Sequence, residues 1–261
     1  MDRQPPAAVL DLLARRAELL DRLVESPAEK SDLVDALDVS RSTVDRALRE
    51  LVDHDLVEQR PDGYRATTPG RLAVESYGQF RRRTERIREA TDVLRALPPD
   101  APLEARALAG AEIVTPTAND PGLPIRRIGE LLRETDGVRG IARAVTERYV
   151  ELYRDRILDG TTVRLVFAPA SLERLLANYA DAVAVALETG RVELRESPDS
   201  DLPPFGLRLY STDETTTVGL TIYDADDDLR AFVRTDDPAA VEWAEARIER
   251  VWTNARPIPT P

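Results

Sequence analysis

Arginine and hydroxyl side chains recur at helical spacing in residues 40–54, SRSTVDRALRELVDH. Arg41, Ser42 and Thr43 stand near the start of this stretch, where a helix lying in the major groove of DNA reaches base edges. Arginine grips guanine through two hydrogen bonds, and serine or threonine can bond to any base. The two later arginines are better placed for phosphates. The predicted DNA contacts of this helix are Ser40, Arg41, Ser42, Thr43, Asp45, Arg46 and Arg49.

The residues before this stretch predict two helices that support it. Residues 7–25 carry apolar side chains at spacings of three and four, which is typical of an amphipathic helix. Residues 26–29, SPAE, match a capping box with proline at the first helical position, and predict the start of a second helix. Ser40 is the predicted cap of the third helix. The predicted inward residues of the third helix are Val44, Ala47, Leu48, Leu51 and Val52.

A hairpin is predicted to follow. In residues 56–67, two short alternating runs flank Pro61, Asp62 and Gly63, a turn sequence. Three helices and a hairpin make a winged helix-turn-helix, here assigned to residues 1–68. Its wing offers side chains for phosphate or minor-groove contact, namely Arg60, Tyr64 and Arg65. The alternative is a winged helix that contacts only proteins.

Residues 69–97 predict a long helix connecting two domains. Its apolar residues follow a heptad spacing, weakened by two threonines, which favours a homodimer through this helix. The alternative is a helix that packs on its own domain. The heptad positions are Ala73, Tyr77, Phe80, Thr84, Ile87, Thr91 and Leu94.

Composition narrows the chemistry that the chain can perform. It has 261 residues and no cysteine, which excludes disulfides and cysteine-based zinc sites. It has one histidine, His54, which almost excludes a Ser-His-Asp triad. We therefore expect no metal, no cofactor and no catalytic group. Residues 224–228 are acidic, but their spacing does not fit an EF-hand, and a solvated turn is favoured over a Ca²⁺ site.

The charge of the chain is strongly negative. The net charge is −12, and Lys30 is the one lysine among 36 basic residues, which is typical of a protein from a salt-saturated cytoplasm. Acidic residues outnumber basic ones even in residues 1–68, although a DNA-binding domain is normally basic. Because counterion release gains little at high salt, specific binding is expected to persist in molar KCl.

We expect a cytoplasmic protein with no membrane segment. No apolar run approaches the roughly 20 residues needed to span a bilayer, and the first ten residues, MDRQPPAAVL, lack a signal-peptide core.

The proline-rich residues 97–102 mark a boundary, after which residues 98–261 alternate strands and helices. Strands are expected at 111–117, 138–145, 162–168, 191–196, 206–210, 218–223 and 229–234, and helices at 125–134, 147–158, 171–188 and 237–253. The predicted fold class is therefore α+β with two domains: an N-terminal winged helix-turn-helix, a long connecting helix and a C-terminal mixed α/β sandwich.

Aromatic and basic residues near the ends of these strands predict a cleft for a small anion, and hence a small-molecule effector. The candidate ligand-binding residues are Arg139, Arg143, Tyr149, Tyr153, Arg164, Phe205, Arg208 and Tyr210.

Segments along nearly the whole chain, from about residue 8 to 256, carry a family resemblance. They are SRSTVDRALREL, GYRATTPGRLA, GVRGIARAV, YVELYRDRILDGTTVRLVFAP, PFGLRLY, TVGLTIYD and AAVEWAEARIERV. The chain resembles archaeal winged-helix regulators with a FilR-type effector domain, a family abundant in halophiles. The resemblance implies a transcriptional regulator with an N-terminal DNA-binding domain and a C-terminal sensory or assembly domain.

The C-terminal pattern also looks distantly like phospholipase D-like domains. Their catalytic motif needs His-x-Lys, whereas His54 and Lys30 both lie in the predicted DNA-binding domain. The leading hypothesis is thus a sequence-specific DNA-binding regulator and not an enzyme. A DNA-tethered enzyme of unknown chemistry and a winged-helix protein-interaction module remain the alternatives.

Overall fold

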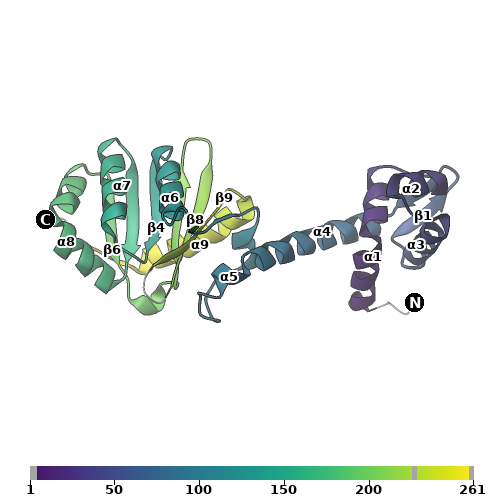
Figure 1. The fold of residues 1–261 in the computed structure, drawn as a ribbon, viewed down its shortest axis with the longest axis horizontal. Helices are drawn as coiled ribbons and strands as arrows, with labels where there is room; N and C mark the ends of the chain where they lie inside the picture. Colours follow the sequence, from purple (N-terminus) through teal and green to yellow (C-terminus); the bar gives the residue numbers. More distant parts are fainter. Residues whose placement is uncertain (1–4, 225–227, 259–261) are drawn as a thin grey trace. The chain divides into compact units, whose positions relative to one another are not determined.

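The computed structural model describes residues 5–224 and 228–258. It divides into two compact units, Met1–Thr84 and Glu85–Pro261, and each has its own hydrophobic core. Figure 1 shows the helices and strands of each unit. Most of the acidic run at residues 224–228 lies outside the described residues.

The first unit is the predicted winged helix-turn-helix. Three helices are followed by a hairpin and by the start of a long helix. These elements are α1 (Pro6–Glu25), α2 (Lys30–Leu37), α3 (Arg41–Asp53), β1 (Val57–Arg60), β2 (Gly63–Ala66) and α4 (Thr68–Glu89). Leu20, Leu33 and Leu51 are fully buried in their shared core, and each such leucine stabilises the fold by about 1.5–3 kcal/mol.

Helix α3 buries one stripe and exposes the rest. Val44, Ala47, Leu48 and Leu51 are buried as predicted, at the spacing of three and four that one helical face requires. Val52 was expected to point inward as well, but 38% of its surface is exposed, because it lies one position beyond that stripe.

The predicted cap at Ser26 is wrong. Helix α2 begins four residues later, at Lys30, and its capping box joins Glu29 to Asp32. The intervening residues are extended: Ala28 forms a β-bridge with Tyr64, in which each backbone N–H bonds to the other residue's carbonyl at 2.9–3.0 Å. A tertiary contact with the wing has therefore replaced the first turn that the local pattern favours.

The first turn of α4 is fastened to the chain between α3 and β1. The Thr67 hydroxyl donates to the Asp55 carbonyl at 2.6 Å, and the Thr67 N–H donates to the Leu56 carbonyl at 3.0 Å. Gly70 packs so closely on Leu56 that an added Cβ would lie 2.0 Å from the Leu56 carbonyl oxygen. Only glycine permits this contact without displacement of the backbone.

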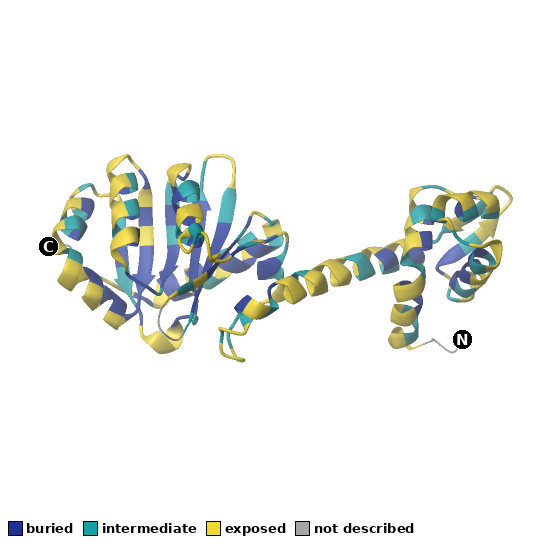
Figure 2. Cartoon of the chain, in the orientation of Figure 1, coloured by how far each residue is buried: buried dark blue, intermediate teal, exposed yellow. Residues whose placement is uncertain are grey.

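The heptad pattern is shorter in the structure than predicted. Helix α4 ends at Glu89, and Thr91 starts a separate short helix, α5 (Thr91–Leu94). Both ends of the pattern serve the cores of their own units: Tyr77 packs on the first core and Leu94 on the second. Phe80 and Ile87 stay exposed, by 60% and 42%, and Figure 2 shows the middle of α4 largely exposed.

The second unit is a mixed sheet covered by helices. Its elements are η1 (Ala105–Leu108), β3 (Glu112–Val114), α6 (Leu123–Arg133), β4 (Gly137–Ala142), α7 (Glu147–Leu158), β5 (Thr162–Phe167), α8 (Pro169–Glu188), β6 (Val192–Glu196), η2 (Asp199–Asp201), β7 (Gly206–Ser211), β8 (Thr216–Tyr223), β9 (Leu229–Thr235), α9 (Pro238–Asn254) and β10 (Arg256–Pro257). The eight described strands run in the order β10-β6-β5-β4-β7-β8-β9-β3, with β4, β5 and β6 parallel and the other neighbours antiparallel.

Helices cover both faces of this sheet, which confirms the α/β sandwich. Residues of α6, α7 and α8 build one core on it, and residues of α9, α5 and η1 build another, around Trp243. Because both faces are buried, the central strands are nearly continuous apolar runs, and Figure 2 shows them as buried.

Candidate nucleic-acid interface

A serine cap sets the start of α3. The Ser40 hydroxyl accepts the Thr43 backbone N–H at 3.2 Å, and it also contacts the hydroxyls of Thr43 at 2.8 Å and Ser42 at 3.0 Å. Ser40 thereby satisfies one of the N–H groups that have no partner within a helix. Its hydroxyl is used by the protein itself, whereas Ser42 lies exposed beside it.

Three exposed arginines of α3, Arg41, Arg46 and Arg49, form no ion pair or side-chain hydrogen bond within the described chain. Every other arginine in residues 5–68 pairs with a carboxylate; these are Arg15, Arg16, Arg22, Arg60 and Arg65. Unpaired, exposed guanidinium groups in an acidic unit are available to an external hydrogen-bond acceptor, such as a phosphate or the edge of a guanine base.

The carboxylates beside these arginines are engaged elsewhere. Asp45 pairs with Lys30 of α2 at 2.6 Å, and this hydrogen bond lowers the pKa of Asp45 and raises that of Lys30. Glu50 pairs with Arg16 of α1 at 2.9 Å, and this hydrogen bond lowers the pKa of Glu50. Both carboxylates are thus ionised at neutral pH and tie α3 to its supporting helices. Asp45, a predicted DNA contact, is occupied by the one lysine of the chain.

The wing residues have partners of their own. Glu58 lies 2.9 Å from Arg60 and 3.4 Å from Arg65, so one carboxylate contacts both arginines and leaves a net charge of +1. Tyr64 is half-buried, its backbone pairs with Ala28, and its ring lies below Lys30, with the ammonium 5.8 Å from the ring centre.

The start of α3 and the wing line one surface hollow. Arg41 of α3, Arg60 and Tyr64 of the wing, and Lys30 of α2 all belong to its wall. The structure therefore places Arg41 beside two of the three predicted wing contacts, whereas Arg65 lines a different hollow.

Four of the eight predicted effector residues form one cluster in the second unit. Tyr149 and Tyr153 of α7 face Arg208 and Tyr210 of β7, and all four are buried. Thr221 and Tyr223 of β8 belong to the same group, although the sequence analysis did not single them out: the Thr221 hydroxyl bonds to Arg208 at 3.3 Å, and the Tyr223 hydroxyl to that of Tyr149 at 3.4 Å. Their alternation within the apolar β8 was the available signal.

The structure does not bring the other four candidates into this group. Arg139 pairs with Glu245 of α9 at 2.5 Å, and Arg164 lies over the ring of Trp252, so both face the opposite side of the sheet. Phe205 is fully buried in the core of that side, 6.4 Å from Trp243 between ring centres. Arg143 follows β4 and pairs with Asp199 at 2.8 Å.

The described residues contain no cluster of three or more histidine or acidic side chains arranged to hold a metal ion. Over the same residues, no helix combines the length and apolar character that a membrane crossing requires.

Comparisons with solved structures give remote likenesses. TrmBL2, an archaeal chromatin protein, matches over 97% of this chain and 100% of its own at 18% identity and a TM-score of 0.42. HmgR of Pseudomonas aeruginosa matches over 94% and 96% at 12% identity and a TM-score of 0.24. The S-adenosylmethionine-dependent methyltransferase SibL matches over 73% and 62% at 18% identity and a TM-score of 0.28. No curated protein matches the chain.

Two family models match, and together they extend over both units. The model of the HVO_A0261 N-terminal domain covers residues 6–89, from α1 to the end of α4. The model of the methanogenesis regulatory protein FilR1, middle domain, covers residues 121–254, from the turn before α6 to the end of α9. Neither match supports the distant likeness to phospholipase D-like domains, whereas the FilR-type resemblance is confirmed. The chain belongs to the FilR1 middle-domain family.

Proposed function

We propose that this protein is a sequence-specific DNA-binding transcriptional regulator. The observation that carries the proposal is the set of three exposed, unpaired arginines on α3. Within residues 5–68 every other arginine pairs with a carboxylate. A family named for a regulatory protein agrees with this role.

In the proposed complex, α3 lies in the major groove of double-stranded DNA. Arg41, Ser42 and Thr43 read base edges near its start, and Arg46 and Arg49 contact phosphates farther along it. The wing contributes Arg60, Arg65 and Tyr64 at the backbone or the minor groove. Asp45 acts indirectly, because its pair with Lys30 holds α3 against α2.

We further propose that the protein works at high salt in the cytoplasm. Because few positive charges are free, few condensed counterions are released on binding, and affinity depends less on salt than for a basic domain. The composition, with a net charge of −12 and one lysine, supports this setting.

The protein is proposed to bind DNA as a homodimer that meets a palindromic site. Phe80 and Ile87 supply an apolar strip on α4 that its own core leaves exposed. Burying such a strip against a second copy would place two recognition helices on successive half-sites. Phe80→Asp should convert a dimer to a monomer in light scattering, whereas Arg82→Asp on the same helix should not.

The second unit is proposed to sense a small molecule or to mediate assembly. Either event would alter DNA affinity by favouring one arrangement of the dimer over another.

The proposal is tested by selecting a DNA sequence from a random pool and titrating it by fluorescence anisotropy. Arg41→Ala with Arg46→Ala should weaken specific binding by about 100-fold or more, since the base contact of Arg41 contributes about 1–3 kcal/mol and Arg46 adds a phosphate contact. Arg22→Ala is the matched control, because Arg22 is already paired with Glu25 on α1 and should leave affinity unchanged.

Two outcomes contradict the proposal. Failure to enrich any sequence from the pool would favour a protein-interaction module. Unchanged affinity of the double variant would show that α3 is not the recognition helix. A titration repeated at about 2 M KCl checks the high-salt role, which requires specific binding to persist there.

A further inference from the structure

Arg208 is a fully buried guanidinium in the middle of the sheet. It lies on β7 with 2% of its surface exposed, and on either side its neighbours in the sheet are glycines, Gly140 of β4 and Gly219 of β8. A Cβ on Gly140 would lie 3.1 Å from Cγ of Arg208 and 2.7 Å from its Cα. The sheet therefore leaves room beside the side chain, toward α7.

No carboxylate among the described residues forms an ion pair with Arg208. Its guanidinium donates one hydrogen bond, to Thr221 at 3.3 Å, and lies 5.5 Å from the ring centre of Tyr149. Its Nε atom has no hydrogen-bond partner, and the buried hydroxyls of Tyr153 and Tyr210 have at most each other. A buried charge of this kind is costly unless it is paired.

The surrounding tyrosines are neutral at physiological pH. Burial raises the pKa of Tyr149, Tyr153 and Tyr210 above that of an ordinary phenol. Burial also opposes the charge of Arg208, yet the surrounding hydroxyls leave its pKa above that of an ordinary arginine. The site thus holds one positive charge and several O–H donors, with no negative charge to balance them.

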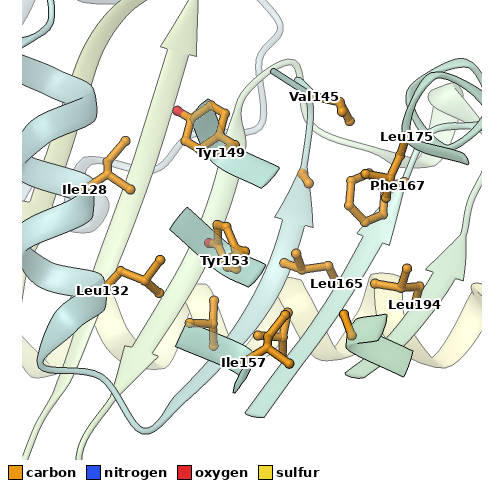
Figure 3. Close-up of a cluster of buried hydrophobic side chains, with 14 of the residues drawn as sticks. Ile128, Leu132, Val145, Tyr149, Tyr153, Ile157, Leu165, Phe167, Leu175 and Leu194 are labelled. Atoms are coloured by element: carbon orange, nitrogen blue, oxygen red, sulfur yellow. The ribbon is translucent and has the colours of Figure 1, made fainter. Parts of the chain in front are cut away.

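These groups open into an apolar pocket under α7 and α8. A cavity of about 90 Å³ lies between these helices and β4, β5 and β6, and it opens to solvent. Arg208, Tyr149 and Tyr153 are the polar part of its wall near the sheet, and the remainder is mostly Ala, Val, Leu, Ile and Phe. Figure 3 shows Tyr149 and Tyr153 beside the sheet residues Leu165 and Phe167 of this wall.

A route from solvent to the pocket lies between α7 and α8. Val150, Arg154 and Ala182 line both the pocket and a hollow on the surface of these helices. Tyr179 in the same hollow interrupts the helical geometry of α8, with φ −136° and ψ 30°. The surface hollow also carries Glu147, Glu151 and Asp181 beside Arg154, so the apolar walls and the guanidinium of Arg208 lie deeper than this charged rim.

We propose that this pocket binds a hydrophobic monocarboxylate, whose carboxylate pairs with Arg208 and accepts hydrogen bonds from tyrosine hydroxyls while its apolar body fills the space under α8. This inference names a ligand class for the sensory role proposed above, and it rests on that proposed function. At its buried end the pocket offers one guanidinium, which balances one negative charge, whereas Arg154 lines the pocket where it meets the surface hollow. A neutral ligand would leave the buried guanidinium unpaired.

The experiment measures binding to the full chain without DNA, by calorimetry. The probes are 4-phenylbutyrate, indole-3-acetate and octanoate, each compared with its neutral amide and with inorganic phosphate. At least one carboxylate should bind about 30-fold or more tightly than its amide, and phosphate should not bind. Arg208→Met should abolish that preference, whereas Arg148→Met, an exposed position on α7, should retain it.

Circular dichroism and thermal unfolding report whether Arg208→Met folds. Without ligand this variant should unfold at an equal or higher temperature, because a buried unpaired charge is removed. If Arg208→Met does not fold, Tyr153→Phe, which removes only a hydroxyl, provides a second test. This variant should weaken binding of the preferred carboxylate about threefold to tenfold.

The inference is wrong if no carboxylate binds better than its amide, or if Arg208→Met retains the preference for the carboxylate. If Arg208→Met does not fold, the inference is wrong when Tyr153→Phe and the parent bind the carboxylate equally well. Because DNA is left out, these outcomes stand apart from a failure of DNA recognition. An operator titration with and without the carboxylate then tests whether the ligand controls DNA affinity.

Discussion

The arginines of α3 and Arg208 both lack ion partners, but they lie in opposite environments. Arg41, Arg46 and Arg49 are exposed and hydrated, so their charges cost the fold little. Arg208 has lost its water to burial and has regained one hydrogen bond. A missing counter-ion therefore has two meanings. On the surface it leaves a group free for a polyanion, and in the interior it indicates a place for a small anion.

The largest expected effect comes from closing the space beside the buried arginine. Gly140→Ala would place Cβ 2.2 Å from the Leu207 carbonyl oxygen, forcing β4 and β7 apart. We expect the second unit to lose about 3 kcal/mol or more in free energy of unfolding. Chemical denaturation followed through Trp243 and Trp252 measures this loss.

Gly122→Ala is the matched control, since the nearest atom to its Cβ would be 3.8 Å away. Equal stability of the two variants would show that the sheet near Arg208 adjusts to an added Cβ. The packing around the buried arginine would then be less rigid than the comparison with the exposed arginines of α3 assumes.

Removal of one exposed arginine should affect DNA binding and leave folding unchanged. Arg49→Ala should reduce affinity for the selected sequence about tenfold and make the slope of log affinity against log salt less negative by about 0.9. Its melting temperature should equal that of the parent. A clear loss of stability would show that Arg49 has a structural partner, and the comparison would fail at that residue.

A smaller effect is expected at the cap that positions these arginines. Ser40→Ala removes the acceptor for the Thr43 N–H and should lower the stability of the first unit by about 1 kcal/mol. Hydrogen exchange in the first turn of α3 measures it. Ser31→Ala, an exposed position on α2, should change nothing there, and identical exchange in both variants would argue against the cap.

The smallest effect concerns pH. The folded pKa of Asp45 lies below its usual value of 3.8, so its pair with Lys30 contributes stability above about pH 4 and loses it as the pH falls through the lowered folded value. The raised pKa of Lys30 adds stability that is present below pH 10.5 and is lost above it. Lys30→Met should flatten both dependences in hydrogen exchange of α2 and α3; unchanged profiles would contradict the pairing.

Much of the fold was predictable because its patterns are local. Helix α7 has the bounds expected from the sequence, Glu147–Leu158, and the buried stripe of α3 follows its apolar spacing. The predicted strand at residues 111–117 shrinks to Glu112–Val114, since only these residues pair with β9. The cap at Ser26 failed where the wing, distant in sequence, paired with Ala28.

The candidate pocket was only half predictable, for a reason specific to this sheet. Arg139 and Arg164 are register partners on adjacent parallel strands, and both point away from Arg208. When a sheet is buried on both faces, neither face reads as polar, so alternation alone does not say which helices a residue will meet. Strand order decided the outcome, and strand order depends on contacts distant in sequence.

The fastening of α4 at Thr67 and Gly70 has a consequence for signalling. Gly70 packs against the Leu56 carbonyl, and Thr67 donates two hydrogen bonds next to this contact. Helix α4 is therefore closely packed on the residues that precede the hairpin. These contacts fix the start of α4 to the chain that leads into the hairpin. We therefore expect this junction to be rigid, and we expect any residue larger than glycine at position 70 to push the start of α4 away from Leu56.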